Sequence, residues 1–353
     1  MMASEQDILA GSLDAHAVVM ADAAHRRGID YDIVLGTSWP MSRPKRPWLR
    51  LSVGACVFYY RLGRILRAGR DGDLGRHVNG SAATLTRNKQ RTKEVLVRAG
   101  YPTPPGRLFR IDALDQALLY AAECRGEICV KPNRGGKGDL VFPMLRDADA
   151  IYRACLDVAE GYEELLVEAS VPGEVWRYFY VHPRVVAVKH SRPASVVGDG
   201  GTTVLGLIDG KNAERERRRV IGHFPIPSGP ALTAMLARQG LTLESVVPAE
   251  RLVFLNAASN GALGADSITC VEGGPHPLYV QRIEAACHAI PNLLVGAIDT
   301  VIRNPEQPPS DGNFWILEIN SSPGVLPYHF PWEGAAQDIC GEIIALLECL
   351  AAA

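Results

Sequence analysis

Acidic side chains interrupt two strongly apolar segments in the last third of the chain. Asp299 ends the apolar run that begins at Val295, and Glu318 and Asn320 end the run that begins at Phe314. A carboxylate within an apolar strand is costly to bury unless it is paired or binds a metal ion. Side chains alternate along a strand, so Glu318 and Asn320 point to one face. With Asp299 on a neighbouring strand, they predict an all-oxygen site for Mg²⁺ held against phosphates, with structural capping as the alternative.

A lysine and a glycine-rich loop follow another short apolar segment. Lys131 follows the run Ile128–Val130, at the end of an expected strand, where a ligand phosphate can reach it. The loop after it offers backbone N–H groups that can surround anionic oxygens. Its glycines are Gly135, Gly136 and Gly138. The spacing of a P-loop is absent, so this segment indicates either a different phosphate-binding loop or a plain surface turn.

Two further groups of charged residues lie before and after this loop. Lys89 and Lys93 are four residues apart on one face of an expected helix, where they reach a polyphosphate or form a solvated basic surface. Glu168 ends an apolar strand, and Glu174 follows a Pro-Gly turn. These two carboxylates suit the adenine amino group and the ribose hydroxyls, or they are exposed acids at a hinge.

Periodicity and turn residues predict helices and strands in alternation. Helices are expected at 15–27, 86–99, 114–124, 148–160, 280–289 and 336–350. Strands are expected at 31–35, 127–131, 164–168, 294–302 and 314–319, and 57–66 is expected to begin as a strand and continue as a helix. The runs 175–181 and 184–190 predict a hairpin around His182-Pro183. The fold class is therefore α+β, with an α/β N-terminal part.

Composition excludes several classes of protein. The formal net charge of -2 gives no overall attraction to nucleic acid or to an anionic membrane. The 8 cysteines include no C-x-x-C pair, and no signal-peptide pattern precedes them, which indicates reduced thiols in the cytoplasm. No apolar run approaches the roughly 20 residues that span a bilayer. We therefore expect a cytoplasmic protein without nucleic-acid or membrane partners.

Taken in order, the charged segments resemble the motifs of the ATP-grasp superfamily. They read N-K-x-x-T-K from Asn88, V-K-P from Val130, V-E…G-E from Val167, and D…L-E-I-N-x-x-P-G from Asp299. The resemblance is closest to the ATP-grasp part of cyanophycin synthetases and of bifunctional glutamate–cysteine ligase/glutathione synthetases. It implies two α+β subdomains that grip ATP. The implied boundaries are 1–85 for a small pre-ATP-grasp domain, 86–172 for the small (lid) subdomain, and 173–353 for the large subdomain with the metal site.

The resemblance also implies roles for the matching residues. Those at the nucleotide are Lys89, Lys131, Gly135, Gly136, Gly138, Glu168, Val171 and Glu174. Of these, the two lysines contact phosphates, Glu168 contacts adenine and Glu174 contacts the ribose. The catalytic residues are Lys189, which faces the γ-phosphate, and Arg177. The metal ligands are Asp299, Glu318 and Asn320, for Mg²⁺ or Mn²⁺.

One position departs from the family pattern. Members often carry an arginine just before a glycine-rich acceptor segment, where this chain has Val253–Asn256. Arg251 is the candidate to replace it, and Arg219 resembles another family arginine near the acceptor loop.

The implied function is ATP-dependent ligation of a carboxylate to an amine through an acyl phosphate, releasing ADP and phosphate. The product is an amide between amino acids or small peptides. Basic residues at Arg177, Arg192 and Arg215–Arg219 predict a further carboxylate on one substrate. The alternatives are a ligase that adds an amino acid to a peptide or protein and a nucleotide-binding regulator without turnover. Formation of a homo-oligomer is left open.

Overall fold

The computed structural model describes residues 13–36, 46–69, 74–136, 138–259, 261–269 and 274–353. Its longer helices are α2 (Ala15–Arg26), α4 (Lys89–Arg98), α5 (Leu114–Glu123), α6 (Ala148–Ala159), α7 (Val204–Arg218), α8 (Pro230–Ala237), α9 (Leu278–His288) and α11 (Ile339–Ala352). Shorter ones are α3 (Gly80–Leu85), η1 (Ile111–Ala113), η2 (Gly261–Leu263) and α10 (Leu326–His329). Lys137 of the glycine loop and Cys270 lie outside the described residues.

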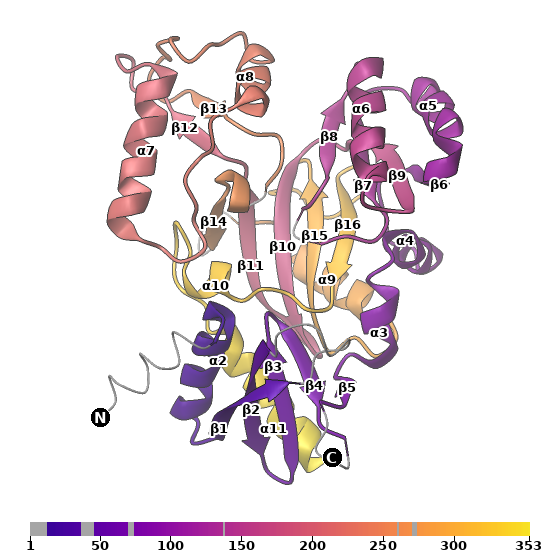
Figure 1. Ribbon diagram of the computed structural model, residues 1–353, viewed down its shortest axis with the longest axis vertical. Helices are drawn as coiled ribbons and strands as arrows, with labels where there is room; N and C mark the ends of the chain where they lie inside the picture. The colour runs from indigo at the N-terminus through magenta and orange to yellow at the C-terminus, as the bar shows by residue number, and fades with distance from the viewer. Residues whose placement is uncertain (1–12, 37–45, 70–73, 137, 260, 270–273) are drawn as a thin grey trace.

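An antiparallel sheet forms the N-terminal unit at the bottom of Figure 1. Its order is β1-β2-β3-β4-β5, and its strands are β1 (Asp30–Gly36), β2 (Arg46–Val53), β3 (Cys56–Arg61), β4 (Arg64–Arg67) and β5 (Arg76–His77). Every neighbouring pair is antiparallel, so the predicted α/β character of this part is wrong. The helix predicted within 57–66 is also wrong. Leu62 and Gly63 take φ angles of 47° and 78° and close a hairpin between β3 and β4.

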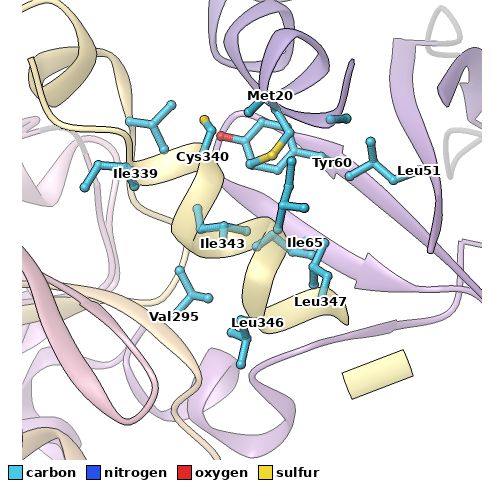
Figure 2. Packing of buried hydrophobic residues seen from close by; sticks show 14 of the residues in the cluster. Met20, Leu51, Tyr60, Ile65, Val295, Ile339, Cys340, Ile343, Leu346 and Leu347 are labelled. Carbon is cyan, nitrogen blue, oxygen red and sulfur yellow. The ribbon is translucent and has the colours of Figure 1, made fainter. Parts of the chain in front are cut away.

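Helices from both ends of the chain cover this N-terminal sheet. Met20 of α2, Leu51 of β2 and Tyr60 of β3 pack with Ile343 and Leu347 of α11 in one buried cluster (Figure 2). The cluster also contains residues from another five-stranded sheet, here called the large sheet: Phe179, Val181, Val295 and Ala297. The N-terminal unit is therefore anchored to the sheet that carries the charged motifs.

A second sheet, at the upper right of Figure 1, has the order β6-β9-β7-β8. Its strands are β6 (Gly106–Arg110), β7 (Ile128–Pro132), β8 (Phe142–Leu145) and β9 (Glu164–Ala169). Helices α5 and α6 pack on it through Ala117, Cys155, Val130 and Leu165. The helices and strands predicted in this part of the chain are confirmed.

The large sheet has the order β14-β11-β10-β15-β16 and is antiparallel throughout. Its strands are β10 (Glu174–Val181), β11 (Arg184–Arg192), β14 (Asp266–Thr269), β15 (Val295–Ile302) and β16 (Phe314–Asn320). The predicted hairpin around His182-Pro183 is confirmed as the β10–β11 pair. Helices α4 and α9 pack on this sheet through Leu96, Ile283 and Ile298.

Beyond the edge strand β14, a smaller unit has a core of its own, at the upper left of Figure 1. Strands β12 (Ser195–Val197) and β13 (Leu252–Phe254) pair there, beside α7 and α8. Val196, Ile208, Leu232 and Val253 are buried in its core. The domain boundaries expected at 85/86 and 172/173 stay predictions. Within the described ranges, the structure has no helix that is long and apolar enough to cross a membrane.

Candidate active site

Four charged residues lie side by side at one level of the large sheet. The strand register places Lys189 opposite Arg177, Arg177 opposite Asp299, and Asp299 opposite Glu318. Residues directly opposite one another on neighbouring strands point to the same face. The four side chains therefore form a row across β11, β10, β15 and β16, here called the charged row. It unites both predicted catalytic residues with two of the predicted metal ligands.

Arg177 and Asp299 form a two-pronged ion pair at the centre of the charged row. Nε and Nη2 of Arg177 donate to Oδ1 and Oδ2 of Asp299. The two side chains are 29% and 10% exposed, so water screens the pair little. Burial lowers the pKa of Arg177, but the charge and hydrogen bonds of Asp299, with the nearby Tyr328 and Glu318, together outweigh burial and hold this pKa above its usual value. Arg177 is thus committed to Asp299 and does not present a free guanidinium fork to a substrate carboxylate.

Asn320 lies against both carboxylates of the charged row. Its Nδ2 donates to Glu318 Oε1 at 2.9 Å and to Asp299 Oδ2 at 3.3 Å. A flip of the amide exchanges its nitrogen and oxygen, so Oδ1 can occupy the same position. Two carboxylates and one amide oxygen then converge, which is a donor set that suits Mg²⁺. The three residues fit the predicted ion.

Histidine, cysteine and carboxylate side chains alone do not make a metal site in the described ranges, where no three of them gather in a suitable group. A cation at the charged row would therefore need the amide of Asn320 and oxygens from a bound phosphate. That requirement agrees with an ion that arrives with a nucleotide.

Lys89 connects the charged row to the glycine loop. Its Nζ lies 3.3 Å from Glu318 Oε2 and donates to the carbonyl oxygen of Gly135 at 3.1 Å. Burial raises the pKa of Glu318, but the charge of Lys89, the hydrogen bond from Asn320 and the charges of Lys131 and Arg177 together outweigh burial and lower this pKa to about 2. Glu318 is therefore ionised at neutral pH.

The start of α4 explains how Lys89 is directed into the site. Asn88 caps the helix, because its Oδ1 accepts from the backbone N–H of Arg91 at 3.0 Å. The first turn is also bonded to the residue before the glycine loop: Lys89 N donates to Asn133 O at 3.2 Å, and Gln90 N donates to Asn133 Oδ1 at 3.0 Å. The helix and the loop therefore hold their relative position.

Glu168 lies between two lysines. Lys93 Nζ is 2.6 Å from Glu168 Oε2, and Lys131 Nζ contacts Oε1. The three side chains are 8%, 2% and 6% exposed for Lys93, Glu168 and Lys131. Burial lowers the pKa of Lys131, but the charge and hydrogen bond of Glu168, with Cys129 and Glu318 nearby, together outweigh burial and hold this pKa above its usual value. We call the three residues the lysine–glutamate cluster; in it, the predicted phosphate ligand Lys131 stays charged.

The acids predicted to contact adenine and ribose differ in exposure. Glu168 is buried, whereas the side chain of Glu174 is 50% exposed at the start of β10, with Oε2 3.7 Å from His190 Nε2. Val171 is half-buried in the turn between β9 and β10. Glu174 is thus accessible to a ribose hydroxyl, while Glu168 has only the lone pairs that the lysines leave free. Contacts of all three residues with a nucleotide stay predictions.

The three glycines of the loop meet different constraints. Gly138 has a φ of 70°, a region that favours glycine. A Cβ on Gly135 would lie 3.0 Å from Pro132 Cγ, whereas one on Gly136 would meet no atom within 4 Å. Gly136 therefore has more open space beside its backbone than Gly135, and the phosphate contacts of all three glycines stay predictions.

Lys189 ends the charged row in a buried position. Its Nζ donates to Ser191 Oγ at 2.6 Å, and the residue is 6% exposed. Burial, followed by the charge of Arg177, lowers the pKa of Lys189 to about 7, while Asp299 acts in the opposite direction. A nearby anion favours the charged form of a lysine. Asp299 only partly stabilises the positive charge of Lys189, and the predicted contact with the γ-phosphate would stabilise it further.

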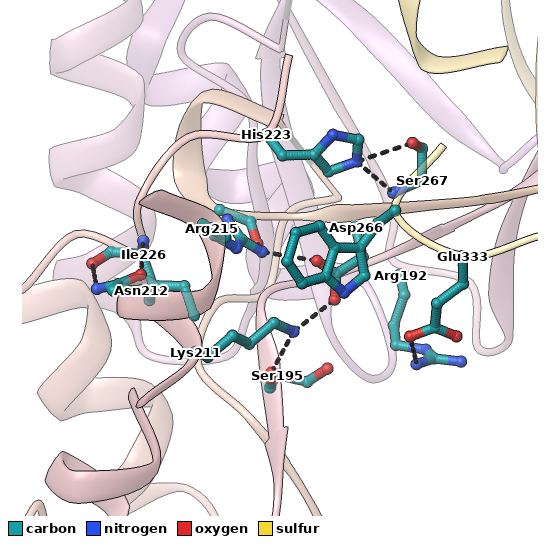
Figure 3. Close-up of polar contacts among 12 residues, drawn as sticks. Arg192, Ser195, Lys211, Asn212, Arg215, His223, Ile226, Asp266, Ser267 and Glu333 are labelled. Atoms are coloured by element: carbon teal, nitrogen blue, oxygen red, sulfur yellow. Dashed lines mark hydrogen bonds and ion pairs between the residues drawn. The ribbon is translucent and has the colours of Figure 1, made fainter. Parts of the chain in front are cut away.

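A second buried carboxylate lies between cations at the edge of the large sheet (Figure 3). Asp266 Oδ2 is 2.6 Å from Lys211 Nζ, and Asp266 Oδ1 is 2.6 Å from Arg215 Nη2. The same cations donate to the backbone oxygens of Ser195 and Gly264, each at 2.7 Å. These bonds fasten α7 to β14. We call Asp266, Lys211 and Arg215 the edge cluster.

Three other arginines that were expected near an acceptor carboxylate have different partners in the structure. Arg192 Nη1 is 3.7 Å from Glu333 Oε1 (Figure 3). Arg218 lies over the ring of Trp332, with its Cζ 4.1 Å from the ring centroid. Arg215 is held in the edge cluster. Of these three, Arg192 has the loosest partner.

Arg219 and Arg251 lie in the smaller unit beyond β14. Arg219 is exposed at the end of α7, and Arg251 Nη2 donates to Gln239 O at 3.3 Å. Across the described residues, no hydrogen bond or ion pair joins either arginine to the charged row. Their suggested roles stay predictions.

Asn79 is a site residue that the sequence analysis missed. It is fully buried, and its Nδ2 donates to Val295 O at 2.7 Å and to Ser321 O at 2.8 Å. Its Oδ1 accepts from the backbone N–H groups of Leu294 and Val295, each at 2.8 Å. Asn79 therefore ties the start of β15 to the end of β16, next to Asn320. Its only sequence signal is an Asn-Gly pair, which indicates a turn rather than this contact.

No family model matches the chain. It is 33% identical over 271 residues to the glutathione biosynthesis bifunctional protein GshAB of Streptococcus mutans serotype c, which covers 74% of this chain and 35% of that protein. It is 28% identical over 312 residues to the cyanophycin synthetase of Synechocystis sp., covering 86% of this chain and 35% of that protein. The chain thus spans about a third of the length of these relatives.

A solved structure supports the same relationship at the level of the fold. The crystal structure of a bifunctional glutathione synthetase from Pasteurella multocida matches with a TM-score of 0.63 and 23% identity. The match covers 95% of this chain and 44% of that one. The predicted resemblance and the predicted α+β fold are confirmed, apart from the α/β character expected of the N-terminal part.

Proposed function

We propose that this chain, which belongs to the ATP-grasp superfamily, is an ATP-dependent ligase that joins a carboxylate to an amine. The proposed substrates are amino acids or small peptides, because its relatives are named for glutathione biosynthesis and cyanophycin synthesis. The product is an amide, and the nucleotide leaves as ADP with inorganic phosphate. Neither a nucleic acid nor a membrane is a proposed partner, and the proposed location is the cytoplasm.

The observation that supports this proposal best is the link that Lys89 makes between the charged row and the glycine loop. Lys89 touches Glu318 of the row on one side and Gly135 of the glycine loop on the other. Lys131 lies near enough for its charge to lower the pKa of Glu318. Buried cations and carboxylates from two sheets therefore meet in one place, as a bound polyphosphate and its metal ion require.

The side chains have separate tasks in the proposed reaction. Lys89 and Lys131 hold the phosphates of ATP, and Lys189 neutralises the γ-phosphoryl group. That group passes to a carboxylate oxygen of the substrate as its bond to ADP breaks. The amine then attacks the carbonyl carbon, and phosphate leaves with the oxygen that accepted the phosphoryl group. Positioning and charge neutralisation supply the catalysis, so no protein nucleophile is needed.

Asp299, Glu318 and Asn320 would hold Mg²⁺, or Mn²⁺ in its place, and the ion would neutralise phosphate charge when bound. Arg177 keeps the carboxylate of Asp299 oriented through both of its oxygens. The glycine loop would limit access of water, which otherwise hydrolyses an acyl phosphate.

A substrate screen tests the proposal. The purified protein is incubated with ATP, Mg²⁺ and pairs of amino acids or small peptides, and released phosphate is measured. We expect ADP and phosphate in equal amounts, together with one amide per ATP, identified by mass spectrometry. AMP and pyrophosphate as products would contradict the acyl-phosphate route. ATP binding without turnover for any pair, including peptide and protein acceptors, would favour a regulator.

A further inference from the structure

We propose that Lys93 is a positioning residue that fixes the carboxylate of Glu168, so that the site accepts adenine and rejects purines with a 6-oxo group. This inference rests on the proposed nucleotide site, because it assigns the selectivity for the base within it. Lys93 lies near the lysines that are expected to bind phosphates, but its own hydrogen bonds go to Glu168 and Pro104.

The ammonium of Lys93 is held by two oxygens. It donates to Glu168 Oε2 at 2.6 Å and to the carbonyl oxygen of Pro104 at 2.7 Å. Its side chain is 8% exposed and that of Glu168 is 2% exposed. Both partners are thus withdrawn from water, and Lys93 has a carboxylate and a carbonyl as neighbours. We therefore assign Lys93 to Glu168 and not to a phosphate.

Glu168 is fixed from its backbone side as well. Gly106 of β6 lies directly opposite Glu168 in the strand register. A Cβ on Gly106 would lie 2.4 Å from the Cβ of Glu168 and 2.7 Å from its Cα. Only glycine leaves room for this approach of the two strands. The backbone of β6 and the ammonium of Lys93 together define where the carboxylate of Glu168 lies.

Lys93 also connects two separate cores. Glu168 belongs to β9 of the β6-β9-β7-β8 sheet, whereas α4 packs on the large sheet, where Leu96 shares a cluster with Ile316 of β16. The bond from Lys93 to Glu168 therefore fixes a carboxylate of one sheet relative to a helix of the other. Such a bond sets the position of the acid within the site between the two sheets.

The chemistry of the purine ring makes this position selective. An ionised carboxylate only accepts hydrogen bonds, and each of its oxygens keeps a lone pair after one lysine contact. The 6-amino group of adenine can donate to that lone pair. A 6-oxo group presents an oxygen there instead, and the two acceptors repel each other. A site with a fixed acceptor rejects the wrong partner because its buried group is left unpaired.

Removing Lys93 should release this constraint. Glu168 would keep Lys131 alone, and its carboxylate could turn to share both oxygens with that lysine. Replacing one partner of a buried ion pair changes both position and charge. The conservative variant Lys93→Arg keeps a cation near the same oxygen, so it separates the loss of the contact from the loss of the lysine.

The test compares ATP with inosine triphosphate, which differs at the 6-position. Wild type, Lys93→Met and Lys93→Arg are measured for binding of both nucleotides by calorimetry, and for kcat/KM with both. The matched control is Lys211→Met, because Lys211 donates to Asp266 at the same 2.6 Å in the edge cluster. We expect the preference for ATP to fall about tenfold or more in Lys93→Met, to be largely kept in Lys93→Arg, and to be unchanged in Lys211→Met.

The outcomes separate this inference from the proposed function. An unchanged ATP preference in every folded Lys93 variant, or a wild type that binds both nucleotides equally, overturns the inference even if ligase turnover is found. A fall in the ratio of binding constants supports it even if no turnover is found. Should Lys93→Met fail to fold by circular dichroism, Lys93→Gln takes its place, because it keeps a donor but loses charge and reach.

Discussion

The N-terminal sheet and the large sheet have five antiparallel strands each, but they treat charge differently. In the N-terminal sheet, Asp32 lies opposite Arg50, and the same register continues through the apolar residues Tyr59 and Leu66. The Asp32 and Arg50 side chains are 57% and 33% exposed and meet at 3.2 Å. Their ion pair is largely solvated, as is usual at a protein surface.

The large sheet carries charge across four strands at one level, and most of it is shielded from water. Counted over the whole residue, exposure is 6% for Lys189 and 7% for Asp299. Burial of a charge costs several kcal/mol unless a partner compensates it, whereas an exposed pair contributes about 0 to 1 kcal/mol. The two sheets therefore have similar strand architecture, but only the large sheet brings shielded charges together into a candidate reaction site. The difference lies in which register positions hold ionisable groups.

The largest expected difference between the two sheets is in activity. Glu318→Ala removes a carboxylate that contacts Lys89 and Asn320, and it should lower kcat by at least about two orders of magnitude, or about 3 kcal/mol. Asp32→Ala is the matched control and should leave kcat unchanged. Both are measured by phosphate release after circular dichroism has shown that the variants are folded. Near-normal turnover in Glu318→Ala would place the metal ligands elsewhere.

The next effect concerns stability. Arg177→Met leaves the carboxylate of Asp299 buried without its two-pronged partner, so the free energy of unfolding should fall by about 3 to 5 kcal/mol. Arg50→Met, in the exposed pair, should cost less than about 1 kcal/mol. Urea unfolding curves give both values. Equal losses in the two variants would mean that the charged row is no more shielded than the surface pair.

A smaller effect should appear as proton uptake. The pKa of Lys189 is lowered to about 7, chiefly by burial, so much of this lysine is neutral at pH 8. A bound phosphate raises that pKa, and ATP binding should therefore take up as much as about one proton at pH 8, with affinity falling as the pH rises above 7. Calorimetry in buffers of different ionisation enthalpy measures the uptake. Lys189→Met should abolish it, and uptake that persists in this variant would assign it to another group.

The smallest expected effect is a change in amide hydrogen exchange within the glycine loop. Amide hydrogens at Arg134, Gly135 and Gly136 should exchange more slowly with ATP bound than without it, because the loop gains phosphate contacts. The turn at Leu62 and Gly63 of the N-terminal sheet serves as the internal control and should not change. Equal exchange rates in the loop with and without ATP would exclude closure over the nucleotide.

Local patterns predicted the elements of the charged row well. Asp299 and Glu318 stand out because they interrupt apolar strands, and the alternating runs around His182-Pro183 indicate the hairpin that carries Arg177 and Lys189. The pairing of these strands brings the residues together, and the order of strands in a sheet is not visible in local sequence. Asp299 and Glu318 were therefore predicted from the residues, and Arg177 and Lys189 from the resemblance, while the register that places the four side by side required the structure.

Contacts between distant segments account for what the sequence did not show. Lys93 and Glu168 are 75 residues apart, and Asn79 and Ser321 are 242 apart, so no local period connects them. The hairpin at Leu62-Gly63 was missed for a related reason. A Cβ on Gly63 would lie 2.2 Å from the backbone oxygen of Pro323. A glycine is therefore required here by a contact with a distant segment, which the local sequence pattern does not reveal.

Transfer of oxygen from the substrate to phosphate tests the central claim most directly. The carboxylate substrate found by the screen is labelled with oxygen-18 in both carboxylate oxygens, and the released phosphate is analysed by mass spectrometry after turnover with unlabelled ATP. An acyl phosphate requires that one carboxylate oxygen leaves with the phosphoryl group, so we predict one labelled oxygen in each phosphate and one in each amide. Phosphate without label, with amide still formed, would contradict the route that the charged row is proposed to catalyse.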